Sequence, residues 1–224
     1  MSKSEAMLRV DQAGEYGATR IYAGQLAVMG DRAPHSAEIA AMAAQEAGHR
    51  ARFDAMIRVD QAGEYGATRI YAGQLAVMGD RAPHSSEIRA MAEQEATHQA
   101  EFDALMARRG VRPTALQPVW SVAGYALGAA TALLGPEAAL ACTAAVEEEI
   151  DRHYTRQLER LEEAKGTQDD DPELAGMIAR FRADEREHRD AALAAGAERA
   201  PAYPLLNAAI RLGCRAAIRL SERI

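Results

Sequence analysis

Residues 88–105 read IRAMAEQEATHQAEFDAL, and their apolar side chains recur at the three- and four-residue spacing of one buried helix face. A second segment, residues 174–192, repeats the arrangement. Each face contains a glutamate and, three residues later, a histidine, namely Glu95 and His98 in the first and Glu185 and His188 in the second. A buried ion needs a partner, because leaving it alone costs on the order of several kcal/mol. The two segments therefore predict helices that place Glu-x-x-His pairs in a shared core.

Two other predicted helices each carry a single glutamate on an apolar face, Glu64 in the segment 64–78 and Glu147 in the segment 140–161. The acidic residues expected on a solvated face or loop are Glu148, Glu149, Asp151, Asp169, Asp170 and Asp171. One glutamate on each of two helices and a Glu-x-x-His on each of two others is the known ligand inventory of ferritin-like di-iron and di-manganese bundles. Oxygen donors with one imidazole per metal favour iron or manganese, and we prefer iron because it activates dioxygen.

The composition supports an all-α globular protein and excludes several classes. Of the 224 residues, 48% are hydrophobic, 26% charged and only 5% aromatic, which is not the composition of a disordered or fibrous chain. The net charge of −7 argues against a nucleic-acid partner, which would require a basic patch. Cys142 and Cys214 lie far apart and form no Cys-x-x-Cys pair, so we expect neither a disulfide framework nor a thiolate metal site.

Residues 8–56 recur as residues 57–105 with 41 identities in 49 positions, which indicates the duplication of a helical hairpin. We therefore predict an extra hairpin over residues 1–56 and a ferritin-like four-helix domain over residues 57–224. No glycine or proline lies between His49 and Ala62, so one helix is expected from about residue 37 to residue 78. The extra hairpin would then project beyond the bundle and serve in dimer contact or helix exchange.

Glycine, proline and serine mark the predicted ends of the other helices. Turns or linkers are expected at residues 79–85, 108–114 and 166–172, with Asp171 as the cap of the following helix and Pro172 as its first residue. Gly196, Pro201 and Pro204 mark the boundary before the last helix, and His35 and His84 are expected to be exposed in turns.

With these motifs the chain closely resembles the demethoxyubiquinone hydroxylases of coenzyme Q biosynthesis, which are membrane-associated members of the ferritin-like di-iron superfamily. The resemblance is carried, in chain order, by RVDQAGEYGATRIYAGQLAV, QEATHQAEF, RPTALQPVW, YALGAATALLG, ACTAAVEEEIDRHY, FRADEREHRD and SERI. It covers nearly all of the 175 residues that remain when one repeat is set aside. It implies a di-iron monooxygenase acting on 2-polyprenyl-3-methyl-6-methoxy-1,4-benzoquinol, with dioxygen and two electrons as the other reactants.

The resemblance also implies roles for individual residues. One iron ion would be bound by Glu64, Glu95 and His98 and the other by Glu147, Glu185 and His188, with Glu95 and Glu185 as bridging carboxylates. His153 and Tyr154 match a His-Tyr pair of the family that serves as a relay or contacts the substrate. For Tyr154 simple core packing is an equally good interpretation, because it also lies on the apolar face of its helix.

The duplication supplies nine candidate ligands for six places. We favour the second copy because it runs directly into RRGVRPTALQPVW at residues 108–120, in the order that the family requires. The alternative set is Glu15, Glu46 and His49 together with Glu64, Glu95 and His98. That alternative would leave Glu147, Glu185 and His188 buried without partners.

A polyprenyl substrate accords with two further segments. Residues 120–134 are apolar, but fifteen helical residues span only about 22 Å, less than the ~30 Å hydrocarbon core, so this helix is expected to lie in the membrane interface. The last helix is amphipathic, with arginines every four residues at Arg211, Arg215, Arg219 and Arg223. A basic amphipathic helix binds anionic membranes, although a core helix with a solvated arginine edge is the alternative. Residues 1–10 contain no apolar run, so we expect a peripheral protein on the cytoplasmic side of a bacterial cell membrane.

Other functions share the predicted ligands. A ferroxidase or storage ferritin would not need the apolar segment or the arginine stripe, and a manganese catalase is possible from the ligands alone. A non-catalytic membrane scaffold for other quinone enzymes would use the metal only structurally. As partners we expect the polyprenyl quinol, dioxygen, the membrane surface, and a second copy of the chain or other proteins of ubiquinone biosynthesis.

Overall fold

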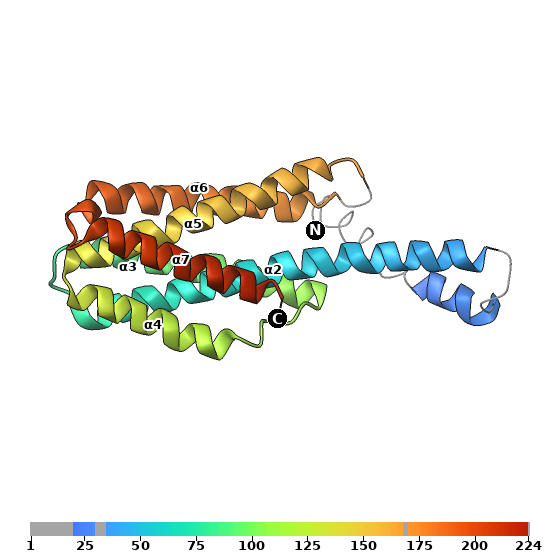
Figure 1. Ribbon diagram of the computed structural model, residues 1–224, viewed down its shortest axis with the longest axis horizontal. Helices are drawn as coiled ribbons and strands as arrows, with labels where there is room; N and C mark the ends of the chain where they lie inside the picture. The colour runs from blue at the N-terminus through green and yellow to red at the C-terminus, as the bar shows by residue number, and fades with distance from the viewer. Residues whose placement is uncertain (1–19, 30–34, 168–169, 224) are drawn as a thin grey trace. The chain divides into compact units, whose positions relative to one another are not determined.

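The computed structural model describes residues 20–29, 35–167 and 170–223, and among them every side chain except that of His49. The described residues are helical with no strand (Figure 1), which confirms the all-α prediction. Residues 20–29 form a short helix. The elements that follow are α2 (Ser36–Met78), α3 (Ser85–Arg109), α4 (Gln117–Leu133), α5 (Pro136–Glu163), α6 (Pro172–Ala194), the 3-10 turn η1 (Ala197–Arg199) and α7 (Tyr203–Ser221).

The helix ends fall where the glycines, prolines and caps predict them. Gly110 ends α3 in the left-handed conformation at φ 68°, and its N–H donates to Met106 O. Asp171 caps α6 by accepting a hydrogen bond from the Leu174 N–H at 3.0 Å, and Pro172 is the first residue of that helix. Arg109 pairs with the same aspartate, its Nη2 lying 3.0 Å from Oδ1. The end of α3 is therefore tied to the start of α6.

The long helix predicted over residues 37–78 is also confirmed, since α2 is continuous from Ser36 to Met78. The chain divides into two compact units between Asp54 and Ala55, within this helix. The first unit includes the described helix at residues 20–29, where Ile21 and Val28 are exposed. The role predicted for this unit in dimer contact or helix exchange stays a prediction.

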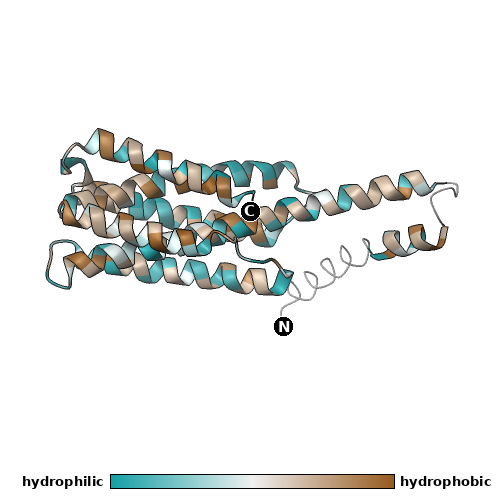
Figure 2. Ribbon diagram, turned by 60° about the horizontal axis from the view of Figure 1, so that its bottom comes forward, coloured by the Kyte–Doolittle hydropathy of each residue, from teal (hydrophilic) through white to brown (hydrophobic). Residues whose placement is uncertain are grey.

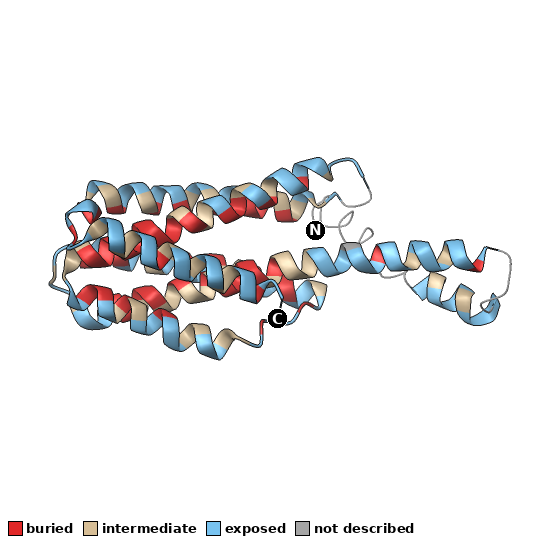
Figure 3. Cartoon of the chain, in the orientation of Figure 1, coloured by how far each residue is buried: buried red, intermediate tan, exposed pale blue. Residues whose placement is uncertain are grey.

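In the second unit, the later half of α2 together with α3, α5 and α6 surrounds a core in which buried residues line the facing sides (Figure 3). The predicted apolar faces of α3 and α6 are buried at every predicted position: Ile88, Met91, Glu95, His98, Phe102 and Leu105 in α3, and Leu174, Ile178, Phe181, Glu185, His188 and Ala192 in α6. On the other two helices the faces that carry Glu64 and Glu147 are buried near these glutamates, whereas Leu75, Met78 and Ile150 are only partly buried. Periodicity therefore located the core correctly.

Helix α5 also packs against α4 and α7 (Figure 1). The contact between α2 and α4 depends on glycines, because a Cβ on Gly73 would lie 2.1 Å from Tyr125 O and one on Gly128 would lie 1.9 Å from Ile70 O. The Trp120 indole N–H donates to Ser221 Oγ at 3.0 Å and so joins the start of α4 to the end of α7. The two helices form a second layer on the bundle.

Hydrophobic and hydrophilic residues alternate along the helices (Figure 2), and in the described part of the chain no helix is long and apolar enough to cross a membrane. Large apolar side chains of the second layer are nevertheless exposed: Val119, Val122, Tyr125 and Leu133 on α4, and Leu205, Leu212 and Leu220 on α7. No Asp, Glu, Lys or Arg occurs in α4. The second layer therefore presents an uncharged apolar helix beside an amphipathic one.

The prediction of a solvated face for Glu149 is wrong. Its side chain is 2% exposed, because α7 packs over α5 at this point and Arg211 Nε donates to Glu149 Oε1 at 2.7 Å. Arg215 also faces this carboxylate, with Nε 3.6 Å from Oε2. Of the arginines on the last helix, Arg211 thus pairs with a buried carboxylate, whereas Arg219 and Arg223 are exposed. His84 is likewise only partly exposed, whereas His35 is exposed as predicted.

Candidate metal centre

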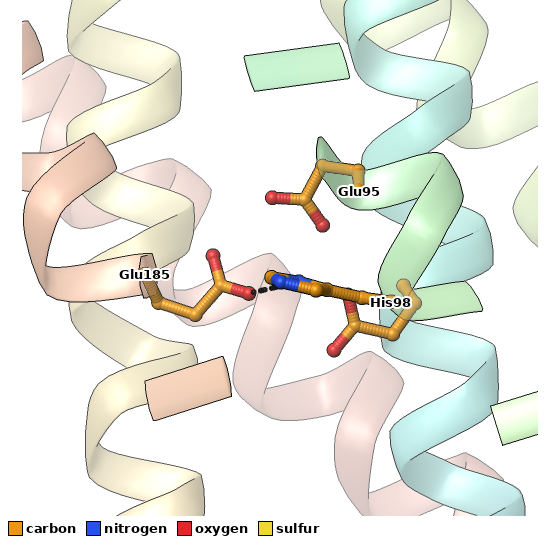
Figure 4. A group of neighbouring side chains, drawn as sticks. Glu95, His98 and Glu185 are labelled. Carbon is orange, nitrogen blue, oxygen red and sulfur yellow. Dashed lines mark ion pairs between the residues drawn. The ribbon is translucent and has the colours of Figure 1, made fainter. Parts of the chain in front are cut away.

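The structure brings the six favoured candidate ligands together at the centre of the second unit. Two groups have one ligand atom per residue within 4.8 Å of each other: Glu64, Glu95, His98 and Glu185, and Glu95, Glu147, Glu185 and His188. Glu95 and Glu185 belong to both groups. Figure 4 shows the carboxylates of Glu95 from α3 and Glu185 from α6 directed into the same space, with the His98 ring reaching Glu185. The six side chains therefore form two adjacent candidate metal positions that share two carboxylates.

The atoms that face the centre have no hydrogen-bond partners. They are Glu64 Oε2, both carboxylate oxygens of Glu95, His98 Nδ1, Glu147 Oε2, both carboxylate oxygens of Glu185, and His188 Nδ1. All six side chains are buried, and those of Glu95 and Glu185 expose no surface. Buried polar groups in folded proteins are almost always satisfied. This converging set of oxygen and imidazole donors therefore fits divalent cations.

Each histidine directs one nitrogen inward and the other outward. His98 Nδ1 lies 3.2 Å from Glu185 Oε1, while its Nε2 donates to Asp184 Oδ2 at 3.0 Å. His188 Nδ1 lies 3.1 Å from Glu95 Oε1, and its Nε2 donates to Gln94 Oε1 at 3.1 Å. Because the outward nitrogen keeps its proton for these hydrogen bonds, the inward nitrogen is the one that can give up its proton and bind a metal.

The ring of Phe181 stacks on the ring of His98, with centroids 4.0 Å apart and planes inclined by 21°. Phe181 also meets Phe102 edge-on at 5.4 Å. The stack and the outward hydrogen bond together leave the His98 imidazole little freedom to rotate. Its inward nitrogen is thus directed at the cluster by packing as well as by hydrogen bonding.

Two tyrosines hold the two single glutamates. The Tyr154 hydroxyl of α5 donates to Glu64 Oε1, and the Tyr71 hydroxyl of α2 donates to Glu147 Oε1 at 2.9 Å. Burial, followed by the nearby carboxylates, raises the pKa of both tyrosines well above its usual value. The sequence analysis did not identify the contact made by Tyr71. The signal was present, since each tyrosine follows the single glutamate of its own helix by seven residues.

His153 does not face the cluster. Its Nε2 donates to Asp60 Oδ1 at 2.9 Å, and the Gln157 amide donates to the same oxygen at 2.8 Å. Burial raises the pKa of Asp60, although the contact with His153 opposes the shift. The structure thus separates the His-Tyr pair that the resemblance groups together, because only Tyr154 touches a candidate ligand.

The carboxylates and imidazoles of the cluster shift the pKa values of one another. Burial, followed by repulsion from Glu185, raises the pKa of Glu95 and of Glu147 well above the usual value. For Glu185 burial acts in the same direction, but the neighbouring imidazoles of His188 and His98 outweigh it and lower the pKa. For His98 burial lowers the pKa, but Glu185 and Glu64 outweigh it and raise the pKa to about 10. A raised pKa means that a group holds its proton more tightly, and bound cations would replace such protons in the cluster.

A solvent-accessible hollow of about 410 Å³ lies over the α3 and α6 side of the cluster. His98, Phe181, Gln94 and Asp184 are among the residues that line it. The outward edge of the His98 imidazole and its aspartate partner therefore lie close to water, whereas the inward nitrogen is buried.

The alternative ligand set draws on residues of the first copy. Glu15 and the side chain of His49 lie outside the described part of the chain. Glu46 is described and buried, but neither of the two groups found among the described residues includes it. The geometric cluster is formed entirely by residues of the second unit.

Comparison with known proteins identifies the family. The family described as "Ubiquinone biosynthesis protein COQ7" matches residues 2–57 and again residues 51–221, so each match contains one copy of the repeat. The 3-demethoxyubiquinol 3-hydroxylase of Rhodospirillum rubrum is 53% identical over 220 residues, covering 98% of this chain and 78% of the relative. The human NADPH-dependent 3-demethoxyubiquinone 3-hydroxylase, mitochondrial, is 52% identical over 224 residues, covering 98% and 77%. The Saccharomyces cerevisiae 5-demethoxyubiquinone hydroxylase, mitochondrial, is 42% identical over 230 residues, covering 98% and 78%. The chain therefore belongs to the COQ7 family of ubiquinone biosynthesis proteins.

Proposed function

We propose that this chain is a di-iron monooxygenase that hydroxylates a demethoxyubiquinol, 2-polyprenyl-3-methyl-6-methoxy-1,4-benzoquinol, in ubiquinone biosynthesis. The observation that carries the proposal is the set of unpartnered carboxylate oxygens and imidazole nitrogens that converge in the core. The printed names of the relatives supply the reaction and the class of substrate. The arrangement of two single glutamates and two Glu-x-x-His pairs supports a bundle of the ferritin-like kind.

The two groups of side chains suggest one iron ion each. Glu64 and His98 would bind the first ion, Glu147 and His188 would bind the second, and Glu95 and Glu185, which belong to both groups, would help to hold both ions. When bound, the iron ions supply the activation of dioxygen, which amino-acid side chains cannot provide.

The residues around the ligands position the donors and exclude water. Tyr71 and Tyr154 each fix one oxygen of a single glutamate by donating a hydrogen bond to it. The donor atoms that face the centre of the cluster are buried, so the reacting atoms would be held away from bulk water. Tyr154 is the better candidate for contact with the reaction, whereas His153 would act through Asp60 and not directly.

The second layer suggests how a polyprenyl substrate reaches the bundle. Helix α4 carries no charged residue and exposes Val122 and Leu133 by more than 70% each. Helix α7 exposes Leu205 and Leu212 on a helix that also carries arginines. Apolar side chains with nearby basic residues bind the surface of an anionic bilayer. The protein would therefore attach peripherally, on the cytoplasmic side of a cell membrane.

The test is a single turnover with counted iron. The full chain is loaded anaerobically with ferrous salt, and bound iron is measured; a short-chain demethoxyubiquinol, ¹⁸O₂ and a two-electron reductant are then added. We expect two iron ions per chain and one ¹⁸O atom in the quinol ring, the other oxygen atom leaving as water. The variant Glu185→Ala should lose both the iron and the product. Two bound iron ions without ring hydroxylation would contradict the proposal and favour a ferroxidase or a scaffold.

A further inference from the structure

The two halves of the cluster are built alike. Tyr154 of α5 holds Glu64 of α2, and Tyr71 of α2 holds Glu147 of α5. The histidines are also held crosswise, each by the residue that precedes the glutamate of the opposite Glu-x-x-His. The His98 Nε2–H donates to Asp184, and the His188 Nε2–H donates to Gln94. Because these contacts match, a difference in metal binding between the two halves can be assigned to the residues that differ.

The difference lies in the charge of the groups that accept from the histidines. Asp184 offers a carboxylate oxygen at 3.0 Å, whereas Gln94 offers a neutral amide oxygen at 3.1 Å. A carboxylate on the outer N–H of an imidazole strengthens the bond by its charge and makes the inner nitrogen a better electron donor. The two tyrosine contacts do not offset this effect, because both halves have one. His98 is thus expected to be the stronger metal-binding imidazole.

The packing around the rings also favours stronger metal binding by His98 than by His188. Phe181 stacks on the His98 ring at 4.0 Å. Phe181 lies four residues before Glu185. Met91 occupies the corresponding position on α3, four residues before Glu95, and its side chain is flexible. A ring held by a stack loses less rotational freedom when it binds a metal. Asp184 is about one third exposed at the edge of the hollow, so water weakens its charge without removing its hydrogen bond.

We propose that Asp184 makes the two metal positions unequal, so that the position formed with Glu64 and His98 binds a divalent cation more tightly and fills first. The inference rests on the metal centre of the proposed function and adds an order of loading to it. Asp184 is a positioning residue in this proposal, since it acts on the metal only through His98. With one equivalent of cation, Glu64, Glu95, His98 and Glu185 would hold the ion.

The experiment is an anaerobic titration of the full chain with Mn²⁺, followed by electron paramagnetic resonance. An isolated Mn²⁺ ion gives a six-line signal and a coupled pair gives a different one, so the two loading steps are counted without reference to activity. In the native chain the isolated-ion signal should rise up to one equivalent and then fall. In Asp184→Asn, which gives both histidines an amide acceptor, the first step should weaken about 10- to 100-fold, and the two steps should merge.

Gln94→Glu is the matched control, because it gives His188 a carboxylate acceptor and should strengthen only the second step. Circular dichroism checks that both variants keep the native helix content. Two indistinguishable steps in the native chain, or an Asp184→Asn titration identical to the native one, would overturn the inference and leave the metal centre intact. A native chain that binds no Mn²⁺ and no Fe²⁺ would instead refute the proposed function itself.

Discussion

The two copies of the repeat carry nearly the same sequence, but their side chains are buried to very different degrees. Ile21 is 58% exposed in the first copy, whereas the equivalent Ile70 is 8% exposed in the second. Met42 is 44% exposed and Met91 only 6%. The second copy packs within a unit that also contains α4, α5 and α6. Local sequence thus determines where helices form, and the partners available within a unit determine which residues become core.

This comparison supplies an internal control for a substitution at any position where the copies are identical. At 41 of the 49 positions, a residue of the second copy and the residue 49 positions earlier are of the same type, and nearly all of their sequence neighbours match. A difference between two such variants reports tertiary environment alone, because helix propensity and the unfolded chain are almost the same for both.

The largest effect is expected at the single glutamates. Glu64→Ala removes a carboxylate that faces His98 and Glu185, and it leaves the Tyr154 hydroxyl without its acceptor. We expect loss of iron from one position and a fall in hydroxylation of more than about 100-fold, because an incomplete ligand set binds the metal poorly. Glu15→Ala should leave both iron content and turnover unchanged. Equal losses in the two variants would favour the alternative ligand set that includes the first copy.

The next effect concerns the core phenylalanines. Phe102 is fully buried and meets Phe181 edge-on, whereas Phe53 is only partly buried. Phe102→Ala should lower the free energy of unfolding of the second unit by about 3–5 kcal/mol through lost burial and the cavity left behind. Phe53→Ala should cost clearly less. Urea unfolding followed by circular dichroism measures both, and similar shifts in the two midpoints would contradict the comparison.

These pairs also show what sequence alone could predict. The buried faces of α3 and α6 follow from a 3.6-residue period, and the ends of the helices follow from local caps such as Asp171, so both were predicted correctly. The contacts that sequence reasoning missed join distant segments. The Tyr71–Glu147 hydrogen bond spans 76 residues, and the His98–Asp184 hydrogen bond spans 86. The error at Glu149 has the same origin, because its burial depends on where α7 docks and not on its own helix.

A smaller effect, with opposite signs in the two copies, is expected at a pair of glycines. A Cβ on Gly73 would lie 2.1 Å from Tyr125 O, whereas one on Gly24 meets nothing within 4 Å. Gly73→Ala should force α4 away from α2 and destabilise the second unit by about 1–3 kcal/mol. Gly24→Ala should instead stabilise its helix by about 0.5–1 kcal/mol, because alanine loses less backbone entropy than glycine. Thermal unfolding distinguishes the two, and destabilisation by Gly24→Ala would show that the first copy has a close partner at this position.

The smallest effect is expected where the copies differ in sequence. Glu101 pairs with Arg180 of α6 at 2.6 Å, and the first copy has Arg52 at the equivalent position. Glu101→Arg therefore gives the second copy the residue of the first and places two arginines face to face. Because both side chains are substantially exposed, the cost should be at most about 1 kcal/mol and should shrink as salt screens the charges.

The double variant Glu101→Arg with Arg180→Glu tests whether this pair helps the bundle to distinguish the two copies. If it does, the second substitution should restore the stability lost in the first, and the coupling energy from the double-mutant cycle should fall with ionic strength. A cycle with no coupling would mean that α6 accepts the charge pattern of either copy at this position. Selection of the second copy would then depend on its place in the chain, directly before α4, and not on the charges that distinguish it.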